Sequence, residues 1–382
     1  MVLQGLSKLP VKVTTKQALT LYQKVANLSA KLGRLNSEFS HSMIDMNLIE
    51  LLALNESVQS TRVEGTQVTF ADMIDESSKS KKSSNVLEVE NYHKALELGI
   101  DLIKAGNPIS TRLIQQIHSV LMDGAVRGTN SAKGEYRKIQ NFIGPDNKIE
   151  HAVYIPVPAN EIAEYMTNLE YFINGEHHNS FDNLKDLDSD EIILDENTNV
   201  LIKTAILHAQ FESIHPFLDG NGRVGRMLIV LNTMGNDLLS NPVFFVSEEI
   251  EKEKIKYYNL LNGIRGNDPD WFSWIDFFIE ASDRMAERLL NKLTKISQLI
   301  TSGLSKIKAS GRVTDSIQNT FIMTIKEPFV NAAKMSDLLN ISVVTARNNL
   351  EYLSEIGLLD FDKSKKRNKT YVNYGVIRAV SE

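Results

Sequence analysis

Apolar residues recur at helical spacing between residues 15 and 105 of the chain. Two such sets are Leu19, Tyr22, Ala26 and Leu28, followed by Ile44, Leu48, Leu51 and Leu52. Because residues three or four positions apart share one face of an α-helix, this pattern predicts helices over most of the segment. The polar run DESSKSKKSSN, residues 75–85, predicts a loop between two of them.

The same periodicity continues into the middle of the chain. It predicts a helix over residues 111–121, with Ser110 as its N-cap and Thr111 as the alternative. Further helices are expected over residues 199–212, 223–234, 248–261 and 271–293. The chain is therefore predicted to be mainly α-helical up to about residue 310.

Residues 138–158, KIQNFIGPDNKIEHAVYIPVP, break this helical pattern. Two β-rich arms flank Gly-Pro-Asp-Asn, which is turn chemistry, so the segment predicts a β-hairpin. A two-stranded ribbon is marginal unless it packs on something, and its free edge can accept another chain as an added strand. The hairpin is therefore a candidate docking surface, and the alternative is an excursion without a binding role.

Two further segments differ from the helical background. Residues 181–197 carry seven acidic residues against one lysine, which predicts a solvated loop. Residues 312–382 predict a winged helix-turn-helix, with two short helices around Asn340-Ile341-Ser342 and a basic hairpin after them. Five of the seven residues from 363 to 369 are basic, and DNA and protein both remain open as ligands of this module.

Composition limits the class of protein. With 382 residues, 42% of them hydrophobic and 24% charged, the chain can form two or three packed domains. A net charge of -6 gives no reason to expect that the whole molecule coats DNA or an anionic membrane. The absence of cysteine excludes disulfides, thiolate zinc sites and a cysteine nucleophile. No secretory leader is evident and no run approaches the roughly 18 apolar residues that span a membrane, so we expect a cytoplasmic protein without membrane contact.

The stretch HPFLDGNGRVGR, residues 215–226, concentrates chemistry in a few positions. Gly220 and Gly222 flank Asn221 just before a predicted helix, so the backbone can turn tightly and aim several N–H groups at one spot. A helix N-terminus adds partial positive charge, and Arg223 and Arg226 add two full charges on one helical face. This combination predicts a polyphosphate site.

Asp219 directly precedes these glycines, where a carboxylate would repel phosphate unless a cation lay between them. One carboxylate together with phosphate oxygens is a usual arrangement for Mg²⁺, so Asp219 is the predicted metal ligand. A histidine such as His215 can remove a proton from a hydroxyl near neutral pH, and Pro216 fixes the backbone after it. From the residues alone, phosphoryl or nucleotidyl transfer is favoured over a structural loop.

The same stretch matches every fixed position of HPFx[DE]GNGRxxR, the signature of the Fic family. Similarity to this family extends through GEYRKIQNFIGPDNKIEHAVYIPVP and PVFFVSEEIEKEKIKYYNLL to most of residues 50–290. The resemblance implies a mainly α, Fic-type helical core with a β-hairpin flap. It also implies transfer of AMP from ATP to a serine, threonine or tyrosine hydroxyl of a protein target or of the chain itself, with release of pyrophosphate.

The resemblance also implies a role for each site residue. His215 would be the base and Asp219 the Mg²⁺ ligand. The nucleotide-binding residues would be Gly220, Asn221, Gly222, Arg223, Gly225 and Arg226, with Arg226 on the γ-phosphate and Tyr258 near the nucleoside. Targets would dock on the flap residues Ile139, Gln140, Asn141, Phe142 and Ile143. The death-on-curing branch of the family replaces the first glycine with a bulkier residue and phosphorylates its target, so the retained Gly220 favours nucleotidyl transfer.

A further motif lies in a predicted helix before the core. In SVQSTRVEG, Ser60 and Glu64 are four positions apart on one helical face, and Gly65 suits a helix end. This stretch resembles the family's inhibitory motif, [ST]xxxE[GN]. The resemblance implies that Glu64 pairs with Arg226 and thereby keeps the γ-phosphate from its site. An ordinary surface glutamate is the alternative.

Together these observations predict four segments. They are an N-terminal helical region (1–105) with the inhibitory helix at about 55–65, a catalytic core (106–292), a linker helix (293–311) and a winged helix-turn-helix (312–382). The expected function is an autoinhibited AMP transferase. The alternatives are a de-AMPylase in which Glu64 positions a water, and a DNA-binding regulator whose core only senses nucleotide. Whether the chain forms a homodimer, and which protein is its target, stay open.

Overall fold

The computed structural model describes residues 2–41, 46–76, 83–124, 132–145, 148–183, 188–361 and 369–381. It divides into two compact units. The larger unit holds Met1–Asn36, Glu56–Thr69 and Lys79–Ala286, and the smaller unit holds Ser37–Asn55, Phe70–Ser78 and Glu287–Glu382. The motif at residues 215–226, together with Ser60 and Glu64, therefore lies in the larger unit.

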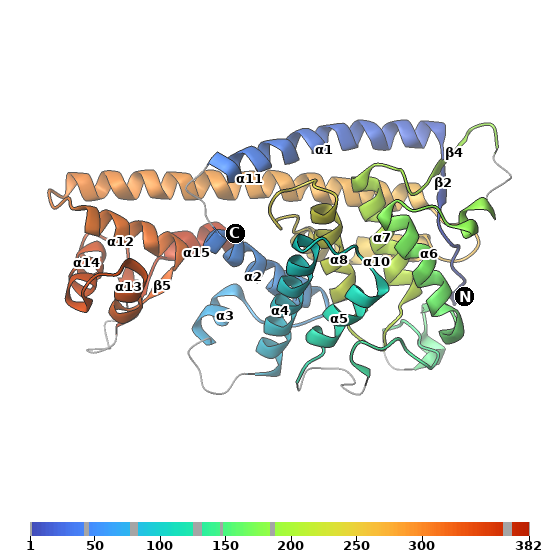
Figure 1. Ribbon diagram of the computed structural model, residues 1–382, viewed down its shortest axis with the longest axis horizontal. Helices are drawn as coiled ribbons and strands as arrows, with labels where there is room; N and C mark the ends of the chain where they lie inside the picture. Colours follow the sequence, from blue (N-terminus) through green and yellow to red (C-terminus); the bar gives the residue numbers. More distant parts are fainter. Residues whose placement is uncertain are drawn as a thin grey trace. The chain divides into compact units, whose positions relative to one another are not determined.

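Helices make up most of the larger unit (Figure 1). Those wholly within it are α4 (Ser84–Lys104), α5 (Thr111–Leu121), α6 (Ile162–Asn174), α7 (Val200–Ile214), α8 (Asn221–Gly235), α9 (Ser247–Lys252) and α10 (Lys254–Gly263). Three more helices contribute residues to both units, namely α1 (Thr15–His41), α2 (Met46–Val63) and α11 (Trp271–Ala309). Short 3₁₀ turns are η2 (Ile149–His151), η3 (Ala159–Glu161) and η4 (Asn179–Asn183). The predicted mainly α-helical fold is confirmed.

Helices α7 and α8 form the centre of the larger unit. Every residue of α7 from Leu201 to Ile214 is buried, and so is nearly all of α8. A helix that is buried on all sides belongs to the core rather than to the surface. The two helices pack against each other, while α4 packs on α8 and α6 packs on α7 (Figure 1). The loop that joins them, residues 215–220, is consequently anchored in the core at both ends.

Two small sheets tie the first residues of the chain to this core. Strand β1 (Leu3–Gln4) pairs in parallel with β3 (Tyr154–Ile155), and β2 (Val11–Thr14) pairs antiparallel with β4 (Glu191–Leu194). Strand β4 lies inside the acidic segment 181–197, so the prediction of a loop throughout that segment is wrong. The reason is its apolar run Ile-Ile-Leu, which ends in the buried Leu194 opposite Val11.

The predicted flap hairpin is much reduced. Its two arms meet at a single antiparallel bridge, in which the Ile143 N–H donates to the Tyr154 carbonyl at 2.8 Å. The outer edge of the second arm is already paired with β1, because Leu3 lies opposite Tyr154. Within the described residues, the first arm forms no regular strand, so residues 139–142 pair with no other strand.

The helix boundaries follow the predicted pattern with local exceptions. Helix α5 begins as expected, because the Ser110 hydroxyl accepts a hydrogen bond from the Leu113 N–H at 3.3 Å. The helix expected over residues 248–261 is broken at Glu253 into α9 and α10. Helix α11 continues through the boundary expected at residue 293 and ends at Ala309. Within the described part of the chain, no helix has the length and apolar character needed to cross a membrane.

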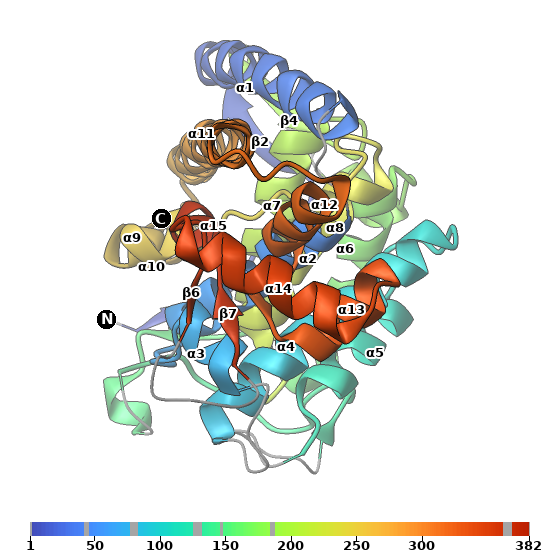
Figure 2. The same ribbon diagram turned by 90° about the vertical axis from the view of Figure 1, so that its left-hand side faces the viewer.

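The smaller unit contains helices around a three-stranded sheet (Figure 2). Its elements include α3 (Phe70–Glu76), α12 (Asp315–Lys326), β5 (Phe329–Val330), α13 (Ala332–Leu339), α14 (Val343–Glu355), β6 (Asp360–Phe361), β7 (Tyr371–Val372) and α15 (Tyr374–Ser381). Asn340, in the left-handed region at φ 51°, ends α13, and Ser342 caps α14. The winged helix-turn-helix stays a prediction, and most of its basic run lies outside the described residues.

Candidate active site

The loop between α7 and α8 has a fixed backbone path. Helix α7 stops because His215 adopts a left-handed conformation, with φ 52°, and is followed by Pro216. Gly220 then turns the chain into α8 at φ 79°. The Asn221 side chain closes the loop, since its Oδ1 accepts from the Phe217 N–H and its Nδ2 donates to the Phe217 carbonyl, both at 2.9 Å. Asn221 therefore shapes the loop with both of its polar atoms.

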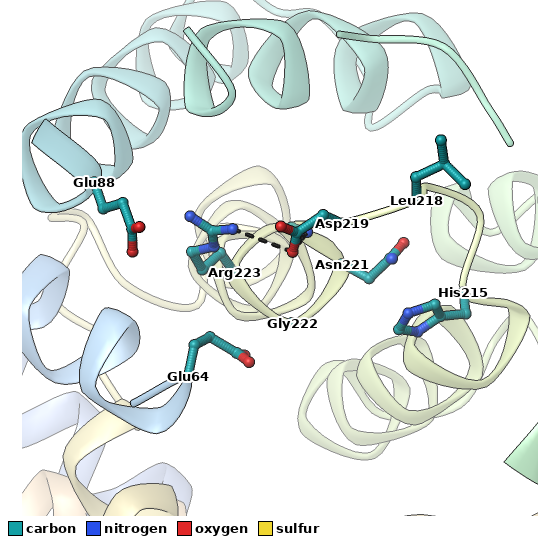
Figure 3. Close-up of a pocket in the computed structure, with 9 residues that line it drawn as sticks. Glu64, Glu88, His215, Leu218, Asp219, Asn221, Gly222 and Arg223 are labelled. Atoms are coloured by element: carbon teal, nitrogen blue, oxygen red, sulfur yellow. Dashed lines mark hydrogen bonds and ion pairs between the residues drawn. The ribbon is translucent and has the colours of Figure 1, made fainter. Parts of the chain in front are cut away.

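A pocket of about 240 Å³ lies against this loop (Figure 3). The loop and the start of α8 supply one wall, with His215 at one end and Arg223 toward the other. Glu64, just after α2, and Glu88, on α4, line the end of the pocket near Arg223 and away from His215. Three acidic residues, Glu64, Glu88 and Asp219, thus line the pocket together with Arg223 and His215.

Arg223 is the clearest sign of an anion site. Its side chain is buried and its Nη2 lies 3.4 Å from Asp219 Oδ1. Its Nε and Nη1 are buried and have no hydrogen-bond partner within the described part of the chain. Buried donors without acceptors are costly, and phosphate oxygens at the start of α8 would satisfy them.

The glycines of the motif lie where a side chain would collide with, or crowd, a neighbouring group. A Cβ at Gly220 would lie 3.1 Å from the Met122 sulfur, and one at Gly225 would lie 2.7 Å from Glu212 Oε1. A Cβ at Gly222 would lie 2.3 Å from Glu64 Oε1. The Glu64 carboxylate therefore lies directly against the first turn of α8, where a phosphate would bind.

Arg226 is held by the end of α2. Its Nε donates to the Ser60 hydroxyl at 2.8 Å, and its Nη2 donates to the Ser60 carbonyl at 3.0 Å and to Glu64 Oε1 at 2.7 Å. The side chain of Arg226 is 1% exposed, whereas that of Glu64 is 38% exposed. Burial raises the pKa of Glu64, but the charge and hydrogen bond of Arg226 outweigh burial, so this pKa lies below its ordinary value. Gly65 follows with φ 93° and ends the helical path.

Asp219 suits a metal that is shared with a phosphate. Its carboxylate lines the pocket with 41% of the side chain exposed, and its Oδ1 accepts from the Gly220 N–H at 2.6 Å. Among the described residues, no group of three or more histidine, cysteine, aspartate or glutamate side chains could hold a metal. Mg²⁺ accepts one carboxylate when phosphate oxygens and water supply the other ligands, so the site fits this ion with a nucleotide bound.

His215 is neutral and oriented for proton transfer. Its Nδ1 lies 3.3 Å from the Glu212 carbonyl, which can only accept a hydrogen bond, so Nδ1 carries the proton and Nε2 has a free lone pair. Burial lowers the pKa of His215 to about 4, and the nearby charge of Arg265 acts in the same direction. The imidazole is therefore in its basic form at neutral pH.

Arg137, which the sequence analysis does not single out, connects the flap to this loop. Its buried guanidinium donates to the His215 carbonyl at 2.9 Å, to the Ile139 carbonyl at 3.1 Å and to the Val157 carbonyl. Arg137 lies within the flap-like sequence, but that stretch predicts strand arms and gives no signal for a buried arginine. The contacts appear only once the fold brings the three carbonyls together.

The remaining predicted site residues are less directly placed. Tyr258 is partly exposed, its ring centroid lies 5.1 Å from that of Tyr257, and it does not line the pocket. On the flap, Asn141 Nδ2 lies 3.4 Å from the Leu218 carbonyl, while the Ile139 side chain is 64% exposed. The flap thus touches the loop at Asn141 and presents an apolar side chain outward at Ile139.

Comparison with known proteins gives two family matches. Residues 108–232 match the Fic/DOC family model, and residues 22–101 match the model of the Fic/DOC family N-terminal region. Among curated proteins, the chain is 23% identical over 252 residues to the protein adenylyltransferase Fic of Drosophila grimshawi, covering 64% of this chain and 44% of that protein. It is 26% identical over 193 residues to a probable protein adenylyltransferase of Aquifex aeolicus, covering 50% of this chain and 51% of the relative. The chain therefore spans about half the length of these relatives or less.

Solved structures support the fold. A crystal structure of a Fic family protein from Desulfovibrio desulfuricans matches with a TM-score of 0.54 at 19% identity. The match covers 92% of this chain and 95% of that one, so the similarity in fold extends through almost all of both chains.

We expect the His215 imidazole to titrate with a pKa of about 4, because it is buried and faces the charge of Arg265. NMR of ring-labelled histidines measures this pKa, and the signal is assigned by its loss in His215→Gln. A midpoint near 6.5, the ordinary histidine value, would contradict the burial and orientation described here.

Proposed function

The chain belongs to the Fic/DOC family, and we propose that it is a protein adenylyltransferase. It transfers AMP from ATP to a serine, threonine or tyrosine hydroxyl of a protein target or of itself. The observation that carries this proposal is the pocket lined by both His215, which is neutral, and Arg223, whose buried Nε and Nη1 have no hydrogen-bond partner among the described residues. That pairing of a base with an anion site is what nucleotidyl transfer to a hydroxyl requires.

The mechanism uses this chain's own groups at each step. His215 Nε2 takes the proton of the target hydroxyl, and the hydroxyl oxygen forms a bond to the α-phosphorus. The bond from the α-phosphorus to the bridging oxygen breaks, and pyrophosphate leaves with its electron pair. Arg223 and the backbone N–H group of Gly222, in the first turn of α8, hold phosphate oxygens in place. Mg²⁺, when held by Asp219, neutralises phosphate charge.

Gly220 supports nucleotidyl rather than phosphoryl transfer. With φ 79° and a Cβ that would lie 3.1 Å from the Met122 sulfur, this position would be strained and crowded for the bulkier residue found in the death-on-curing branch. The phosphates can therefore approach the loop along the path that the retained glycine leaves open. The flap serves target docking in this proposal, since residues 139–142 pair with no strand among the described residues.

We further propose that the enzyme is autoinhibited at rest. Arg226 is the residue assigned to the γ-phosphate, and Ser60 and Glu64 occupy its guanidinium. Because Glu64 Oε1 lies against Gly222, a γ-phosphate at Arg226 would meet a carboxylate in the same place. ATP would then be seated with its α-phosphorus out of line with the attacking hydroxyl.

A second activity is favoured by one observation. Glu64 and His215 line the same pocket, and the Glu64 side chain is partly exposed. A carboxylate in this position can orient a water toward the phosphorus of an AMP-modified side chain. De-AMPylation is therefore the alternative function that uses the same residues.

Glu64→Gly is expected to raise AMP incorporation, and adding His215→Ala is expected to abolish it. Discounted for the exposure of Glu64, the lost pair corresponds to about 1–2 kcal/mol, or roughly tenfold in rate. The measurement is the label incorporated into protein during incubation with Mg²⁺ and ATP that is labelled at either the α- or the γ-phosphate. It is made with and without cell lysate as a source of targets. Gln67→Gly is the matched control, because it adds a glycine near the same turn at an exposed residue.

The labelled position separates the alternatives. Label from the α-phosphate on protein supports AMP transfer, whereas label from the γ-phosphate alone would identify a kinase. If neither label is incorporated into protein, even with lysate present, the alternative of a DNA-binding regulator whose core only senses nucleotide becomes the favoured one. Equal incorporation by Glu64→Gly and the unmodified protein would contradict autoinhibition while leaving AMP transfer intact.

Thr66→Val is expected to release the inhibition partly. The buried Thr66 hydroxyl donates to Glu88 Oε2 at 3.1 Å and so anchors the turn that follows Glu64 to α4. Loss of this bond corresponds to roughly 0.5–1 kcal/mol, or about two- to fivefold more AMP transfer. The incorporation of α-phosphate label into protein measures the AMP transfer of this variant.

Thr61→Val is the matched control for this prediction. Thr61 is equally buried, but its hydroxyl donates to the Ser57 carbonyl within α2 at 2.9 Å. We expect its AMP transfer to stay within about twofold of the unmodified protein. An equal rise in both variants would show that general loosening of α2, and not the bond to Glu88, controls the activity.

A further inference from the structure

His118, on α5, contacts the catalytic loop from outside the motif. Its ring is buried and stacks on Phe217, with centroids 3.7 Å apart and planes 5° from parallel. Its Nε2 lies 3.0 Å from the Asp219 carbonyl, and its Nδ1 lies 2.9 Å from the Gly134 backbone nitrogen. One side chain therefore touches the loop twice and also the segment that leads into the flap.

These contacts fix the protonation of the ring. The Gly134 N–H can only donate, so His118 Nδ1 must accept and carries no proton. The proton of the neutral imidazole is then on Nε2, which donates to the Asp219 carbonyl. Both ring nitrogens are satisfied in this one tautomer, so the ring is held in a single orientation.

The contact with the Asp219 carbonyl sets the direction of a whole peptide group. In a trans peptide the carbonyl and the following N–H point in opposite directions. With the Asp219 carbonyl directed to His118, the Gly220 N–H points away from α5, where it meets Asp219 Oδ1 at 2.6 Å. Asp219 and Gly220 both line the pocket, so the direction of this N–H fixes the carboxylate that borders the site.

We propose that His118 is a positioning residue for the phosphate and Mg²⁺ site. It holds the peptide between Asp219 and Gly220 in the orientation in which the Gly220 N–H binds and positions the metal-binding carboxylate of Asp219. Through Gly134 it also links that peptide to the segment before the flap. The proposal rests on the proposed function, because it assigns His118 to the site at which that reaction takes place.

Two substitutions separate the contacts of His118. In His118→Gln the side-chain amide nitrogen can take the place of Nε2, which keeps the donor to Asp219 and loses the acceptor for Gly134. In His118→Asn the amide oxygen can take the place of Nδ1, which keeps the acceptor and loses the donor. Both remove the ring that stacks on Phe217, so each variant is the control for the other.

The measurement is the affinity for ATP by calorimetry over a series of Mg²⁺ concentrations, with both substitutions made in Glu64→Gly. Groups that orient a metal ligand typically contribute 10–100-fold to metal affinity, so we expect His118→Asn to need roughly tenfold more Mg²⁺. His118→Gln should stay within about threefold of its parent, because the bond to Asp219 is kept. The melting temperature of each variant shows that it folds.

Three outcomes would overturn the proposal. Equal losses in folded His118→Asn and His118→Gln would show that the ring acts only by packing, and no loss in either would show that the contact has no effect. A third test needs no substitution: ¹⁵N shifts of His118 in the unmodified protein that report a proton on Nδ1 would exclude the donor to Asp219. A Glu64→Gly parent that binds Mg²⁺ and ATP but transfers no AMP would contradict the proposed function alone.

Discussion

The arrangement of this site depends on one buried guanidinium group, that of Arg226, which needs a partner to compensate its charge. Arg226 is 1% exposed and lies on a helix that is buried along nearly its whole length, so its charge must be compensated where it is. In the structure, Ser60 and Glu64 compensate it. In the proposed reaction the γ-phosphate takes their place. The same constraint therefore stabilises the resting arrangement and creates the site on Arg226 from which ATP must displace Ser60 and Glu64.

The fold supplies the rigidity that this exchange requires. Helices α7 and α8 are buried on all sides, which fixes both ends of the loop that carries His215 and Asp219. Inside the loop, Asn221 bonds the backbone of Phe217 twice, and Arg137 binds the His215 carbonyl from the flap side. Glu64, in contrast, lies at a helix end where the side chain is partly exposed. The catalytic groups are held by the core, and the group that blocks them is held at its edge.

Local patterns in the sequence predict much of this site. The glycines and the two arginines of residues 215–226 predict an anion site, because they specify a short stretch of backbone. The contact between Glu64 and Arg226 joins distant parts of the chain, and only the resemblance to the family's inhibitory motif implied it. The roles of Arg137 and His118 are not predictable in this way, since they depend on backbone carbonyls from distant segments. Strand β4 is missed for the same reason, because its partner β2 lies far earlier in the chain. The pairing of β1 with the outer edge of the second flap arm is missed for the same reason.

Calorimetric comparison of ATP with ADP tests most directly whether Glu64 and the γ-phosphate compete for Arg226. In the unmodified protein the two nucleotides should bind with similar affinity, because Arg226 is not accessible to the γ-phosphate. In Glu64→Gly, ATP should bind roughly tenfold more tightly than ADP, and Arg226→Gln added to that variant should remove the preference. The same preference for ATP with and without Glu64 would contradict the account.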